Sequence, residues 1–76
     1  MRLGDWMKEN RVKQSEVARA INAGQSTISL IAAGLVMPRI VITNEIEEFT
    51  KGMVTRMDFL LHTEEVRLNR KKVLET

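Results

Sequence analysis

Uncharged side chains that form hydrogen bonds, together with one leucine, occupy five positions between residues 25 and 30. They are Gln25, Ser26, Thr27, Ser29 and Leu30. A glutamine amide bonds adenine through two atoms, serine and threonine hydroxyls reach base edges or phosphates, and an apolar group contacts the thymine methyl. Solvated helix faces more often carry lysine and glutamate. The segment is therefore a candidate for contacting base pairs, with the plain polar face of a helical bundle as the alternative.

Residues suited to catalysis or metal binding are sparse. His62 is the only histidine and the chain has no cysteine, so neither a metal site nor a disulfide framework is expected. Glu47 and Glu48 are adjacent and fall on different faces of a helix, which leaves no carboxylate pair for acid–base work. We expect a protein that is not an enzyme and needs no cofactor, metal or small-molecule ligand, with His62 at the surface or at a helix end.

Charge is unevenly distributed along a chain whose net charge is only +2. No acidic residue occurs from Val17 to Asn44, and residues 40–66 are net acidic between two net basic segments. Because a polyanion repels carboxylates, the acid-free segment suits a surface that faces phosphates, although chance clustering in a short chain explains it equally well. Lys13 and Arg39, which lie on either side of the uncharged positions, are candidate phosphate contacts.

Apolar residues recur at helical spacing in the first half of the chain. The helices that this spacing predicts cover residues 2–10, 14–22 and 25–33. Asn10 is expected to close the first helix, since asparagine tolerates the left-handed conformation. Gly24, or failing that Asn22, is expected to take a positive φ in the turn between the second and third helices. Gly34 is placed as a C-cap glycine, and Pro38 prevents continuation.

The second half of the chain is less clear. Four β-branched residues over 40–43 favour a strand, whereas Ile42, Ile46 and Phe49 recur at the spacing of a helix. The longer periodic signal predicts a fourth helix that runs to about residue 50. Residues 55–58 read as a capping box with aspartate in place of glutamate. It would start a short fifth helix that carries Phe59, Leu60 and Leu61.

We therefore expect one all-α domain, a compact bundle of about five short helices, over residues 1–62. Residues 63–76 form a charged tail, either a marginal helix or a mobile arm. Its cations are solvated or touch phosphate; they are Arg67, Arg70, Lys71 and Lys72. The longest apolar stretch, residues 28–42, is interrupted and is no membrane span. The absence of cysteine fits a reducing cytoplasm.

Residues 14–34 have the form of a helix-turn-helix, two short helices joined by a tight turn, with small Ala18 where the helices cross. This segment resembles the helix-turn-helix domains of phage Cro proteins and cI-type repressors in the xenobiotic-response-element class. The matching residues are Gln14, Ala18, Gly24, Gln25, Ser26, Ile28, Ser29, Gly34 and Pro38. Residues 47–59 are similar to the end of small YdaS-like Cro and antitoxin domains. The resemblance covers about residues 3–61.

The resemblance implies a sequence-specific transcriptional repressor that binds double-stranded DNA in a bacterial cytoplasm. It also implies a homodimer on a pseudo-palindromic operator, with two recognition helices about 34 Å apart. In this family pattern Gln14 would bond a phosphate and brace Gln25, while Gln25 and Ser26 would reach base edges or phosphate. Thr27, Ser29 and Leu30 would do most of the base discrimination. An antitoxin-type module that binds a partner protein is the alternative.

The chain departs from the family pattern at Lys13, at Asn22 and over residues 35–37. Asn22 replaces the commoner turn glycine, which is sterically tolerable. Lys13 stands where relatives carry threonine or serine as an N-cap, which should cost about 1 kcal/mol of stability, although a lysine there adds a possible phosphate contact. Residues 35–37 are more apolar than the usual charged loop. We expect these apolar side chains to pack into the core or to form part of a dimer contact rather than a free loop.

Overall fold

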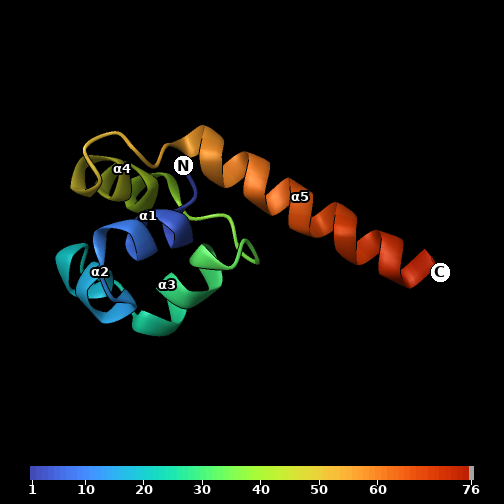
Figure 1. Cartoon of the computed structure of the whole chain (residues 1–76), viewed down its shortest axis with the longest axis horizontal. Helices are drawn as coiled ribbons and strands as arrows, with labels where there is room; N and C mark the ends of the chain where they lie inside the picture. Colours follow the sequence, from blue (N-terminus) through green and yellow to red (C-terminus); the bar gives the residue numbers. More distant parts are fainter. Residues whose placement is uncertain (76) are drawn as a thin grey trace.

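The computed structural model describes residues 1–75, so the last residue of the predicted 63–76 tail lies outside the described part of the chain. Residues 1–75 form five helices and no strand, which confirms the expected all-α fold (Figure 1). The helices are α1 (Leu3–Asn10), α2 (Gln14–Ala20), α3 (Gln25–Ala32), α4 (Ile40–Phe49) and α5 (Arg56–Glu75). None of these five has both the length and the apolar character needed to cross a membrane.

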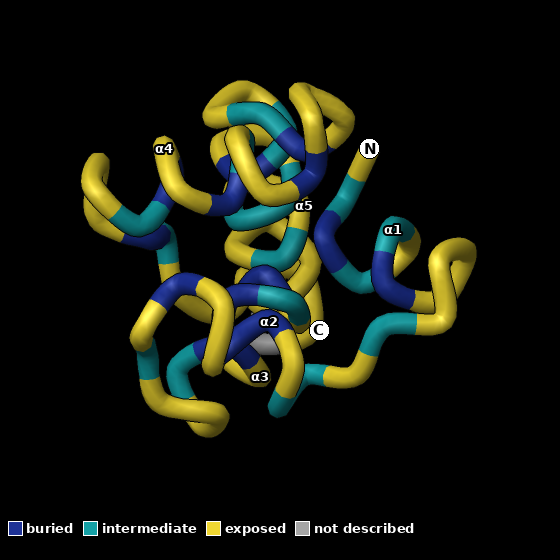
Figure 2. The backbone as a smooth tube through the Cα atoms, turned by 90° about the vertical axis from the view of Figure 1, so that its left-hand side faces the viewer, coloured by how far each residue is buried: buried dark blue, intermediate teal, exposed yellow. Residues whose placement is uncertain are grey.

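The core is built from apolar side chains at helical spacing in the first three helices, together with one residue each from α4 and α5 and one from the loop between them. Its buried members are Leu3, Met7, Val17, Ala18, Ile21, Ile28, Ile31, Ile46, Val54 and Phe59. Figure 2 shows the buried backbone in dark blue turned toward the middle of the body, with exposed turns outside. Trp6 packs edge-on against Phe49, with ring centroids 5.5 Å apart. This aromatic pair ties α1 to the end of α4.

One helix end is closed by a residue other than the one expected. Arg11, rather than Asn10, takes the left-handed conformation after α1, with φ 55°. Its N–H donates to the Lys8 carbonyl, and the Val12 N–H donates to the Met7 carbonyl at 2.9 Å. In such a helix end, the residue directly after the helix takes the left-handed conformation, so that the N–H groups there reach back to carbonyls of the last turn. Because α1 ends at Asn10, that residue is Arg11. Lys51 likewise has φ 55° after α4.

Residues 40–43 are helical, so the helical interpretation of this ambiguous segment is confirmed. Arg39 is the extended N-cap of α4. The buried Thr43 donates its hydroxyl to the Arg39 carbonyl at 3.0 Å, and buried Thr50 donates to the Ile46 carbonyl at 2.8 Å. Threonine is therefore accommodated within α4 at Thr43 and at its C-cap, Thr50, because each hydroxyl bonds the preceding turn.

The capping box at the start of α5 is confirmed. The Thr55 N–H donates to Asp58 Oδ2 at 2.8 Å, and the Asp58 N–H donates to Thr55 Oγ1 at 3.4 Å. The prediction that this helix is short was wrong, since α5 continues without interruption for 20 residues. Strong helix formers without glycine or proline follow Phe59, and their propensity sustains the helix after the buried residues end. The expected boundary between residues 62 and 63 thus lies inside α5.

Candidate nucleic-acid interface

The expected pair of helices joined by a tight turn is present. It consists of α2, residues 21–24 and α3. Val17 on α2 and Ile28 on α3 are completely buried, which holds the two helices together. Lys13 is the N-cap of α2, as expected, and its ammonium cannot accept a hydrogen bond. Glu16 Oε1 instead accepts a bond from the Lys13 N–H at 3.2 Å. This half of a capping box offsets part of the cost assigned to Lys13.

The turn before α3 is made by Asn22 and not by Gly24. Asn22 has φ 55°, and the Ala23 N–H donates to the Ala18 carbonyl at 2.8 Å. Gly24 has φ −71° and serves as the extended N-cap of α3. A glycine has no side chain with which to bond the first amides of a helix. The N-terminus of α3 therefore has no side-chain cap, and its amide groups point outward as donors for an anion.

The outer face of α3 carries short, uncharged side chains. Four exposed positions follow one another at helical spacing: Ser26, Ser29, Leu30 and Ala33. Ile28 and Ile31, on the opposite face, are fully buried. The two isoleucines fix the rotation of the helix, and the short outer side chains let its backbone approach another surface closely. This arrangement suits insertion into a groove about 12 Å wide.

The remaining predicted residues are placed less uniformly. Gln25 is exposed at the first position of α3, whereas Thr27 is half-buried beside the core-facing side of the helix. Gln14 is half-buried at the first position of α2. Among residues 1–75, no hydrogen bond joins Gln14 to Gln25, so the brace that the family pattern implies is not formed in the free chain.

The cations and the acid-free segment surround α3 without covering it. Lys13 and Arg39 are both exposed, as the N-caps of α2 and α4. The segment without carboxylates, Val17 to Asn44, includes the whole of α3 and much of its two neighbouring helices. Within residues 17–44 no carboxylate opposes the approach of a polyanion to the outer face of α3, and the carboxylates nearest in the sequence are Glu16 on α2 and Glu45 on α4.

Gly34 closes α3 as predicted and is held against α5. Gly34 has φ +74°, and the Leu35 N–H donates to the Leu30 carbonyl at 3.0 Å. A Cβ on Gly34 would lie 2.7 Å from Cδ2 and Nε2 of His62. Burial against this turn lowers the pKa of His62, the charge of Arg2 lowers it further, and Glu65 and Asp5 oppose the shift. The His62–Gly34 contact fixes the end of α3 relative to α5.

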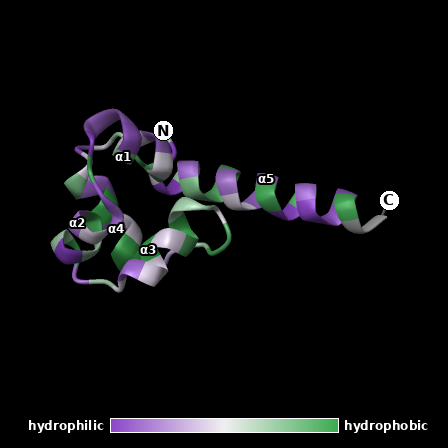
Figure 3. Ribbon diagram, turned by 60° about the horizontal axis from the view of Figure 1, so that its bottom comes forward, coloured by the Kyte–Doolittle hydropathy of each residue, from purple (hydrophilic) through white to green (hydrophobic). Residues whose placement is uncertain are grey.

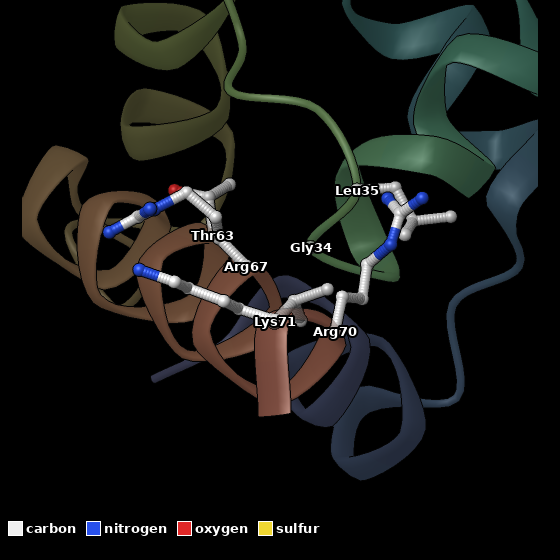
Figure 4. Close-up of a pocket in the computed structure, with 7 residues that line it drawn as sticks. Gly34, Leu35, Thr63, Arg67, Arg70 and Lys71 are labelled. Carbon is white, nitrogen blue, oxygen red and sulfur yellow. The ribbon is translucent and has the colours of Figure 1, made fainter. Parts of the chain in front are cut away.

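The loop after α3 is only partly buried within the single chain, so the expected packing into the core is met by one of its three apolar side chains. Met37 packs against the core, but Leu35 and Val36 remain 49% and 42% exposed. A hollow of about 510 Å³ separates this loop from α5; its lining residues are Gly34, Leu35, Thr63, Val66, Arg67, Arg70 and Lys71 (Figure 4). Figure 4 shows the Arg70 side chain extending from α5 toward Leu35.

Two features of this region were not identified from the sequence. Ala33 completes the outer stripe of α3, and its spacing of seven residues from Ser26 is the signal that would have found it. The contact between His62 and Gly34 joins residues far apart in the chain and leaves no local signal.

Comparison of the chain with protein-family models, curated protein sequences and solved structures finds no match.

Proposed function

We propose that the chain is a sequence-specific DNA-binding protein that inserts α3 into the major groove, in the manner of the Cro and cI-type repressors that its sequence resembles. The observation that carries the proposal is the two-sided character of α3. Fully buried isoleucines on one side set the helix in place, while the other side presents short, uncharged side chains to solvent. A solvated helix of this size would be expected to carry charge.

In this proposal the contacts divide by distance from the groove. Ser26, Ser29 and Leu30 meet base edges, with the leucine suited to a thymine methyl. Gln25 lies at the mouth of the groove and the free amides at the start of α3 bind a phosphate. Lys13 and Arg39 contact the backbone on either side, which adds affinity without sequence preference.

We further propose that the chain acts as a transcriptional repressor by occupying promoter DNA in a bacterial cytoplasm, where two copies bind the two halves of a pseudo-palindromic operator. Two-fold symmetry of the protein would then be matched by the operator, with half-site centres about 34 Å apart. Thr27 and Gln14 are half-buried. In this proposal they hold the neighbouring exposed side chains in place, and only their own exposed atoms reach the DNA.

Selection of bound sequences from a random DNA pool, followed by titration at two salt concentrations, tests the proposal. Ser29→Ala is expected to weaken binding to the selected sequence by about 1–3 kcal/mol, with little change in binding to scrambled DNA. Asn44→Ala, an exposed polar residue on α4, is the matched control and should change neither. A pool from which no sequence is enriched, or equal effects of the two variants, would refute the proposed contact face.

The exposed loop residues favour a second candidate, an antitoxin-type module. Leu35 and Val36 present adjacent apolar side chains outside the core, and a partner protein would cover them. Co-expression with a candidate partner should then yield a stoichiometric complex without DNA, which Leu35→Ser weakens. An unchanged complex with Leu35→Ser would exclude this loop as the contact.

A further inference from the structure

The C-terminal half of α5 lies outside the body of the protein. Side chains from Arg67 to Val73 are all exposed, and α5 extends away from the other four helices in Figure 1. A helical segment with little buried surface is marginal in water below about 12–15 residues, because most helical stability comes from packing of one face. A second surface packed against the part of α5 that projects from the body would therefore stabilise this helix.

An apolar stripe runs along the outer side of α5, opposite the buried Phe59. Leu61 and Leu68 are seven residues apart and share this side, and they are 62% and 46% exposed. Figure 3 shows hydrophobic and hydrophilic segments alternating along the whole helix. Because Phe59 anchors the opposite side in the core, a partner can cover the two leucines without displacing the body of the protein.

The charges beside this stripe change sign along the helix. Glu64 and Glu65 precede Leu68, while Lys71 and Lys72 follow it. Helical spacing places Glu64 and Lys71 on one side of the leucines and Glu65 and Lys72 on the other. Glu64 already pairs with Arg67 and Glu65 with Arg2, yet both carboxylate side chains stay 56% exposed and can accept a second cation.

This pattern is complementary to itself when reversed. If two α5 helices lie antiparallel with their Leu68 side chains at the two-fold axis, Glu64 faces Lys71 of the second copy and Glu65 faces Lys72. A parallel arrangement would set like charges side by side, which is destabilising. DNA would suit the lysines, but it would repel the two glutamates and leave Leu68 uncovered. The described residues thus favour a second copy of the chain as the occupant.

We propose that two copies of the chain associate through antiparallel pairing of their α5 helices about Leu68. With a rise of about 1.5 Å per residue, the two Phe59 anchors lie about 27 Å apart along the pair. The inference deepens the proposed function, on which it rests for the role of two chains on one operator. The association itself needs no DNA.

Sedimentation equilibrium of the full chain without DNA tests the pairing. The wild type is expected to dimerise in a concentration-dependent manner. Leu68→Glu places two carboxylates at the two-fold axis. It should raise the concentration at which half of the chains are dimeric by about tenfold or more. Val41→Glu alters an apolar residue on α4 that is more exposed than Leu68 and should not change this concentration. Far-ultraviolet circular dichroism and thermal melting check that both variants remain folded.

Charge reversal tests the antiparallel register. The variants Glu64→Lys/Glu65→Lys and Lys71→Glu/Lys72→Glu should each lose self-association, form a heterodimer when mixed, and regain a homodimer when all four changes are combined. A wild type that stays monomeric at every concentration, a combined variant that fails to dimerise, or loss with Val41→Glu in place of Leu68→Glu would overturn the proposal. Lys71→Glu/Lys72→Glu that weakens DNA binding and leaves self-association intact would also overturn it, by assigning these cations to phosphate. Failure here leaves selection of DNA by α3 independently testable on the monomer.

Discussion

Replacing Gly34 with alanine tests the contact that holds the end of α3 against α5. Gly34 has φ +74°, and a Cβ there would lie 2.7 Å from two atoms of the His62 ring. The left-handed conformation costs a residue with a Cβ about 1–2 kcal/mol. Overpacking against the ring adds about 1–3 kcal/mol, because the ring is carried by α5 and lies directly against this turn.

We therefore expect Gly34→Ala to lower the free energy of unfolding by about 2–5 kcal/mol, which corresponds to a Tm lower by roughly 10–40 °C for a domain of this size. The same change made together with His62→Ala should cost only the conformational part, about 1–2 kcal/mol. Urea denaturation of the four chains of this cycle measures both values. Costs that agree within about 0.5 kcal/mol in the two backgrounds would show that the ring and the glycine are not coupled.

Three further predictions concern single side chains. Because the pKa of His62 is lowered in the folded chain, the unfolded chain binds more protons than the folded chain between that pKa and 6.5. The contribution of His62 to the free energy of unfolding should be complete above pH 6.5 and should fall as the pH drops through this interval. His62→Gln should remove that part of the pH dependence in thermal melts. Thr50→Val deletes the oxygen that accepts a bond from the Val54 N–H at 3.1 Å and should cost about 1–3 kcal/mol in urea denaturation, since a buried donor is left without an acceptor; an unchanged midpoint would contradict this. Lys51→Asn, at φ 55°, should stabilise the fold by about 0.5–1 kcal/mol, because asparagine tolerates this conformation better; a lower Tm would count against the assigned strain.

The elements that the sequence predicted well are those with a local cause. Ile28 and Ile31 set the face of α3, Gly34 ends it, and the Thr55–Asp58 pair starts α5; each signal lies within one or two turns of the chain. The helical outcome at residues 40–43 followed because the apolar spacing extends through Ile46, whereas β-branching is only a local preference.

The errors have causes that local patterns do not contain. Both Asn22 and Gly24 tolerate a positive φ, and the bond from Ala23 back to Ala18 decides which residue turns. The length of α5 was underestimated because apolar periodicity fades after Phe59 while helix propensity does not. The half-burial of Thr27 depends on the rotation of α3 by a fraction of a turn, which is finer than a sequence pattern resolves.

Backbone amide chemical shifts recorded while a selected DNA duplex is added test the central claim most directly. If α3 enters the major groove, the largest changes should fall on residues 25–33 and the start of α2, and a scrambled duplex should produce much smaller ones. Changes confined to α4 or α5, or equal responses to the two duplexes, would contradict the assignment of α3 as the element that reads the sequence.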